Sequence, residues 1–109
     1  MSDDRLLLMH IQECLKRVSQ YTSGGETEFL ASTIVQDAVL RNLQTLAEST
    51  QRLSEGVKAN YPRVDWRGLA GFRNILVHSY LGIDLGRVWI IVERDLPELQ
   101  AVIDSTLAE

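Results

Sequence analysis

Four side chains suited to chemistry gather within one short segment, RNILVHSY, at residues 73–80. They are Arg73, Asn74, His78 and Tyr80. On an ideal helix Asn74 and His78 are one turn apart and share a face. Arg73 lies about 140° from His78 around the helix axis, so only a broad groove can receive both side chains. Tyr80 nearly eclipses Arg73, which places it at the edge of the same groove.

These side-chain types suit the cleavage of RNA without a metal ion. The ribose 2′-hydroxyl must lose a proton as it attacks the adjacent phosphorus, and the leaving oxygen must gain one. Histidine titrates near neutrality and can perform either transfer, which typically contributes about 10²–10⁴-fold to the rate. Arginine binds a phosphate bidentately and stabilises the charge that grows on it. Asn74 would orient His78 or bind a phosphate oxygen.

The same residues also have purely structural interpretations. A histidine near a helix end often caps the helix, and Asn74 with His78 can form a buried polar pair that fixes helix register. Arg73 can be an ordinary salt-bridge partner, while Tyr80 and the two tryptophans can be core anchors. A single histidine also supplies only one of the two proton-transfer groups, unless two copies of the chain meet through this helix. The residue types alone leave these alternatives open.

Other kinds of site find little support in the sequence. The two histidines, His10 and His78, are far apart, and neither they nor the single cysteine has a zinc-ligand spacing. Phosphate-binding glycine loops and the GxSxG elbow are absent. We therefore predict no metal and no cofactor. Cys14 falls on the apolar face of a helical pattern, which predicts a packed core thiol, and a lone cysteine suits a reducing cytoplasm.

The charge distribution points to a local anionic ligand. A net charge of −4 argues against a protein that coats nucleic acid through bulk electrostatics. Residues 61–87 nevertheless contain four arginines against two aspartates, and the remainder of the chain is strongly acidic. A basic strip on an acidic body suits one anionic ligand, although chance clustering is the alternative. With neither a signal peptide nor a membrane-spanning run, a cytoplasmic protein is expected.

Helical periodicity dominates the chain and predicts an all-α antiparallel bundle of four to five helices, forming a single domain over residues 1–109. The first helix should run from about Asp4 to Tyr21 and stop at paired glycines. A longer helix should follow from about Glu26 to Leu53. Its apolar stripe includes Leu30 and Ile34, and its width predicts contact with more than one neighbour.

Two further helices complete the predicted bundle. Asp65 is a good N-cap for a third helix, which carries the RNILVHSY segment and should end near Gly82. The last helix should run from about Leu85 to Leu107. Pro97 lies inside that pattern, which predicts either a kink or a division into two pieces.

The segment RNILVHSY has the form Arg, four residues, His, one residue, Tyr, and closely resembles the motif of the HepT-like toxins in the HEPN superfamily of helical ribonucleases. The surrounding YPRVDWRGLAGFRNILVHSYLGIDLGRVW resembles the core of that family. QDAVLRNLQTLAES and DLPELQ resemble its second and last helices, so that the resemblance covers nearly the whole chain. One departure is mild: Ala47 precedes Glu48 where family members often have glycine. Glu48 either helps to position the site or is simply solvated or salt-bridged.

The resemblance implies an all-helical homodimer, or a higher homo-oligomer, in which two motifs face each other and form one RNase site. Carried over to this chain, Arg73 and His78 are catalytic and Asn74 supports them. Tyr80 is the expected AMP acceptor for the partner antitoxin, a minimal nucleotidyltransferase. The added phosphate and bulk would oppose RNA in the groove and silence the toxin.

The sequence also allows two alternatives to a toxin RNase. In the first, the bundle is a non-catalytic module that presents substrate or nucleotide to a separate nucleotidyltransferase. The intact pair of Arg73 and His78 favours the enzyme over this module. In the second, the chain is a plain helical dimerisation module, which leaves the clustered polar residues unexplained.

Overall fold

The computed structural model describes residues 2–78 and 82–108. Over these residues every regular element is a helix and no strand is formed, which confirms the predicted all-α class. In chain order the helices are α1 (Ser2–Tyr21), α2 (Gly25–Ala31), α3 (Thr33–Arg52), α4 (Glu55–Ala59), α5 (Trp66–His78), α6 (Leu85–Ile90), the π-helical segment η1 (Ile91–Asp95) and α7 (Leu96–Ala108). None of them combines the length and hydropathy needed to cross a membrane.

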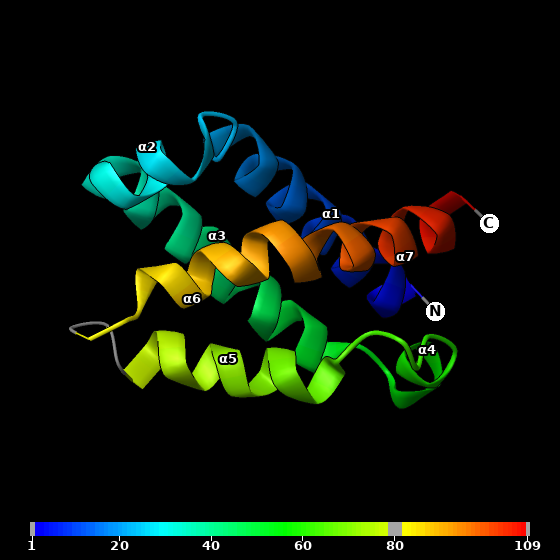
Figure 1. Cartoon of the computed structure of the whole chain (residues 1–109). Coiled ribbons are helices and arrows are strands. Elements are labelled where there is room, and N and C mark those ends of the chain that lie inside the picture. The colour runs from blue at the N-terminus through cyan, green and yellow to red at the C-terminus, as the bar shows by residue number, and fades with distance from the viewer. Residues whose placement is uncertain (1, 79–81, 109) are drawn as a thin grey trace.

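Helix α3 lies at the centre of the bundle (Figure 1). It packs against α1, α2 and α5, while α7 packs against α1 and α2 packs against α6. The contact of α3 with several neighbours confirms the prediction made from its wide apolar stripe. The most deeply buried side chains come from five different helices: Ile11, Val18, Phe29, Val39, Leu43, Leu46, Val88 and Ile103.

Helix α1 follows its predicted stripe closely. It ends at Tyr21, as expected, and Gly25, where α2 begins, has φ = 87°, which glycine adopts at little cost. Cys14 is buried and free, which confirms the predicted core thiol. Burial raises the pKa of this thiol above its ordinary value. Tyr21, expected on the same stripe, is exposed instead.

The predicted long second helix is wrong, because the chain divides at Ser32. This residue is extended, with φ = −113° and ψ = 112°, and its hydroxyl accepts the Val35 N–H at 3.2 Å. Gln36 donates its side-chain amide to the carbonyl of Phe29 at 2.9 Å, across the break. Serine favours such a cap over a helix interior. Leu30 and Ile34, expected to widen the stripe, are exposed as a consequence.

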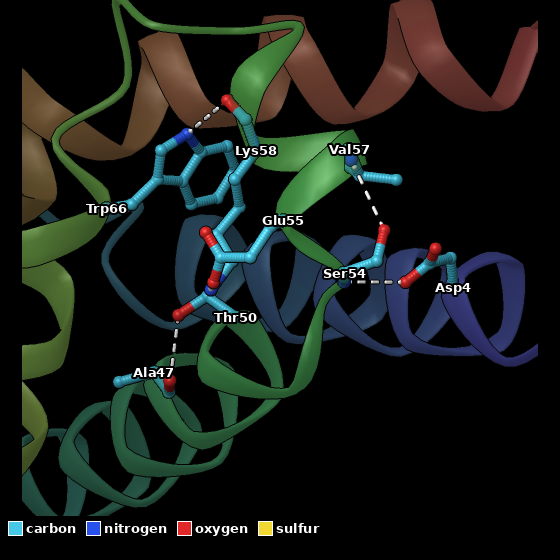
Figure 2. A network of polar contacts seen from close by, with 8 residues as sticks. All are labelled: Asp4, Ala47, Thr50, Ser54, Glu55, Val57, Lys58 and Trp66. Atoms are coloured by element: carbon cyan, nitrogen blue, oxygen red, sulfur yellow. Dashed lines mark hydrogen bonds and ion pairs between the residues drawn. The ribbon is translucent and has the colours of Figure 1, made fainter.

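A short helix that the sequence pattern did not predict, α4, joins α3 to the loop before α5. The Ser54 hydroxyl accepts the Val57 N–H at 3.2 Å and so caps α4. The Ser54 N–H in turn donates to Asp4 Oδ1 on α1 at 2.9 Å (Figure 2). Asp4, expected only to complement the positive end of its own helix, is therefore buried against a distant segment. This contact ties α4 to α1.

The last predicted helix continues in one direction through α6, η1 and α7, but its backbone hydrogen bonding changes before Pro97. The Leu96 N–H donates to the carbonyl of Ile91, five residues back, within the π-helical segment η1. Proline lacks an N–H, and its ring clashes with the carbonyl one turn earlier, so the turn before it widens. The predicted disturbance thus occurs as a π turn.

Candidate functional site

Helix α5 carries the candidate site, and its first turn is fixed by polar contacts. Asp65 Oδ1 accepts the Gly68 N–H at 2.9 Å, which confirms the predicted N-cap. The indole Nε1 of Trp66 donates to the carbonyl oxygens of Lys58 and Tyr61, both at 3.1 Å; Figure 2 shows the Lys58 bond. The start of α5 is therefore held by α4 and the loop that follows it.

One side of α5 packs against α3. Gln51 of α3 donates its side-chain amide to the Ala70 carbonyl of α5 at 3.4 Å. Leu76 is buried, and Leu69 and Phe72 pack against the same core. Since Ala70 and Arg73 are three residues apart, they share a side of the helix, and Arg73 projects toward α3.

The structure brings Arg73 and Asn74 together. Arg73 is partly buried, and its Nη1 donates to Asn74 Oδ1 at 3.2 Å. Its Nε is buried and meets no acceptor among the residues that the structure describes. Asn74 is exposed. The Arg73 guanidinium therefore extends from the side of α5 that faces α3 to the solvent-exposed amide of Asn74. An arginine held in this way presents donors beside an open face of α5.

His78 lies one turn beyond Asn74, at the last described residue of α5. It is exposed and makes no side-chain hydrogen bond or ion pair with the part of the chain that the structure describes. The structure thus places Asn74 and His78 on one open face, as predicted. Tyr80 lies among residues 79–81, outside the described residues. Gly82, near which we expected the helix to end, is described and is not helical.

The structure contradicts one of the purely structural interpretations, removes support for a second and confirms a third for Trp89. The buried Asn74–His78 pair is wrong, because both side chains are exposed. Arg73 forms no ion pair with any described residue, which removes support for its role as an ordinary salt-bridge partner. Trp89 is a core anchor, 8% exposed, with its ring centroid 5.5 Å from that of Phe29.

The basic strip does not form one continuous patch. Arg63 and Arg87 line a cleft of about 420 Å³ between α5 and the segment formed by α6, η1 and α7. Arg73 does not line this cleft and lies on the side of α5 that faces α3. Asp95 and Glu98, more distant in the sequence, line the same cleft and oppose its positive charge. The cleft floor is apolar, with Leu69, Phe72, Ile91 and Leu99 among its residues. Helix packing therefore divides the predicted strip between two surfaces.

The structure adds residues to the surroundings of the site that the sequence did not single out. Gln51 contacts α5 directly, although nothing in the apolar pattern distinguishes it from other surface glutamines. Glu48 is partly buried and lines a groove between α1 and α3, without an ion pair to a described residue. Over residues 2–78 and 82–108, no group of three or more His, Cys, Asp or Glu side chains is arranged to hold a metal ion.

The fold and the site define a small helical protein whose central feature is a helix that displays arginine, amide and histidine groups. A family model described as "Ribonuclease HepT-like" matches residues 11–106. The chain therefore belongs to the HepT-like ribonuclease family. The family description and the names of related proteins indicate ribonuclease activity.

Related proteins come from archaea and bacteria. An RNase candidate of Methanocaldococcus jannaschii is 34% identical over 112 residues, covering 98% of this chain and 93% of that protein. A second M. jannaschii protein, named as a gamma-glutamylcyclotransferase and RNase candidate, is 32% identical over 108 residues. The match covers 98% of this chain but only 49% of that longer protein. The mRNA nuclease HepT of Shewanella oneidensis is 26% identical over 132 residues, covering 91% and 92% of the two chains. No solved structure gives a significant match.

Proposed function

We propose that this chain is the toxin of a toxin–antitoxin pair and cleaves RNA internally without a metal ion, with Arg73 and His78 as its catalytic residues. The observation that carries the proposal is the open face of α5, where His78 is exposed one turn from an Asn74 that holds the Arg73 guanidinium. Membership of a ribonuclease family supports the same assignment.

The proposed reaction needs only the groups on this face. The 2′-oxygen attacks the adjacent phosphorus as its proton passes to a base, and the bond from phosphorus to the 5′-oxygen breaks. The products are a 2′,3′-cyclic phosphate and a 5′-hydroxyl, whose proton comes from an acid. His78 serves as one of these proton-transfer groups. Arg73 stabilises the negative charge on the non-bridging oxygens, and Asn74 positions Arg73.

The proposal includes a homodimer, because one histidine cannot be base and acid in the same step. Ile75 and Ile90 are 51% and 49% exposed, and Ile90 lines the apolar cleft beside α5. A two-fold interface on this face would also pair the arginines of one cleft with the acidic residues of the other. Gly71, one turn before Ile75, has open space at its Cβ position and would admit close approach of a second helix. Both copies of His78 would then reach one cleft.

Regulation by a nucleotidyltransferase antitoxin forms the last part of the proposal. Tyr80 is two residues beyond His78 and would accept AMP from ATP, with release of pyrophosphate. The new phosphodiester would place negative charge and bulk beside His78, where the RNA phosphate must bind. The resemblance of RNILVHSY to the family motif supports this assignment, and both steps are expected in the cytoplasm.

The first test is RNA cleavage by the purified protein in the presence of EDTA, beside the His78→Ala variant. The wild-type protein should cleave RNA and leave cyclic phosphate ends, whereas His78→Ala should lose about 10²–10⁴-fold in rate. Mass spectrometry should first establish that Tyr80 is unmodified. If folded, unmodified protein cleaves none of a varied set of RNAs, the chain is instead a partner module that presents substrate to a nucleotidyltransferase.

A further inference from the structure

A second hollow of the surface shares no lining residue with the cleft described above. It is an open groove of about 820 Å³ between α1 and the outer face of α3, which we call the α1–α3 groove. Its walls are Asp3, Leu6, Leu7 and His10 from α1, and Arg41, Gln44, Thr45, Glu48, Ser49 and Arg52 from α3. Nothing in the proposed cleavage step uses these residues.

Helix register places this groove beside the candidate active site. Helices α3 and α5 run in opposite directions (Figure 1), and Gln51 meets Ala70 between them. Glu48 is one turn before Gln51 in α3, and Asn74 is one turn after Ala70 in α5. Glu48, a wall of the α1–α3 groove, therefore lies on the turn of α3 that is next to Asn74. A strand leaving the active site over this turn enters the groove.

The groove contains cationic side chains that are free to bind an anion. Arg41 and Arg52 are exposed, and neither forms an ion pair with a described residue, although Asp3 and Glu48 line the same groove. Arg41 and Arg52 are separated by about 16 Å along α3, at 1.5 Å per residue. Glu48 is one turn from Arg52 but forms no ion pair with it, so the Arg52 guanidinium is available to a phosphate.

The remaining lining suits an unpaired strand. Gln44 offers an amide that can bind phosphate or ribose oxygens, and Leu6 on the α1 wall is 65% exposed, which offers apolar contact to an unstacked base. We propose that the α1–α3 groove binds the single-stranded RNA that flanks the scissile bond, through phosphate contacts from Arg41 and Arg52. This inference rests on the proposed ribonuclease function and extends it to the binding of the substrate beyond the reacting phosphate.

The groove predicts opposite effects from two changes of charge. The double variant Arg41→Gln/Arg52→Gln should bind a short single-stranded RNA about tenfold more weakly at about 0.1 M salt. Its plot of log affinity against log salt should be shallower by about 1.4, since each single-strand phosphate contact contributes about 0.7. Asp3→Asn should bind the same RNA more tightly, because it removes a like charge from the path of the phosphates. Arg94→Gln, which changes another exposed arginine outside the groove, should match the wild type.

The binding probe should carry 2′-O-methyl groups throughout, so that it cannot be cleaved and binding is measured apart from catalysis. Cleavage of an ordinary dinucleotide, too short to reach the groove, should proceed at the wild-type rate in the double variant. Unchanged RNA affinity and salt dependence in the double variant would overturn the inference and leave the groove to a protein partner. Absence of dinucleotide and longer-RNA cleavage by the wild type would instead refute the proposed function, whatever the binding result.

Discussion

Arg73 is the residue whose placement says most about the site. It projects from the side of α5 that faces α3, yet its Nη1 reaches the exposed Asn74 and its Nε is buried without a described acceptor. A buried polar atom left unsatisfied costs about 1–3 kcal/mol. An apolar residue at this position would avoid that cost, so the arginine is better explained by what it binds than by what it stabilises.

Replacement of Arg73 should therefore damage catalysis more than folding. Both Arg73→Ala and Arg73→Lys should lower kcat/KM for RNA cleavage by about 10²-fold or more, because lysine keeps the charge but cannot form the two parallel bonds of a guanidinium. Single-turnover cleavage assays would measure the loss, with the thermal midpoint as the control for folding. Wild-type rates in Arg73→Lys would show that a point charge suffices and that the guanidinium geometry has no role.

At the scale of elements, α5 is held in position by contacts that reach across the chain. Its first turn is tied to α4 through Trp66, and α4 is tied to α1 through the Asp4–Ser54 bond. The backbone N–H of Ser54, followed by its hydroxyl, lowers the pKa of Asp4 below the ordinary value. The carboxylate is therefore favoured by folding, and its protonation should loosen this connection.

This shift predicts a pH dependence of stability that one variant removes. A carboxyl whose pKa is lower in the folded state stabilises the protein above its unfolded pKa, about 4, and that contribution is lost as the pH falls through the folded pKa. The difference in free energy of unfolding between wild type and Asp4→Asn should thus be largest near neutral pH and shrink below about pH 4. Urea denaturation at several pH values would measure it. A difference that stays constant, or grows, as the pH falls would contradict the role given to the Asp4 carboxylate.

At the scale of the whole molecule, the exposed apolar surface beside α5 has no covering within the protomer. Ile75 should lie in the proposed dimer interface, so Ile75→Lys should shift the protein toward monomer and reduce cleavage, since each cleft would keep only one His78. Sedimentation velocity over a range of concentrations would measure the shift. Ile34→Lys is the matched control, because Ile34 is 81% exposed at the start of α3, away from this face, and should leave the dimer intact. A wild-type protein that is active as a monomer would contradict the shared site.

The sequence by itself determined the all-α class, the burial of the α1 stripe, the Asp65 cap and the common face of Asn74 and His78. These features depend on residues within one or two helical turns of one another, where apolar spacing and capping chemistry act directly. The sequence also indicated the HepT-like family, which the family model confirms. The break at Ser32 and the short helix α4 were missed because a serine can cap a helix or continue it, and local preference does not decide between them.

Tertiary structure alone decided how the charges are shared among surfaces. Arg63, in the loop before α5, and Arg87, on α6, line the cleft that Arg73 does not reach, and Asp95 and Glu98 were brought from the last part of the chain to oppose them. It also set Gln51 and Glu48 beside α5 and turned Asp4 into a partner for Ser54. Such contacts join residues far apart in the sequence, and they depend on how helices cross rather than on the periodicity within any one of them.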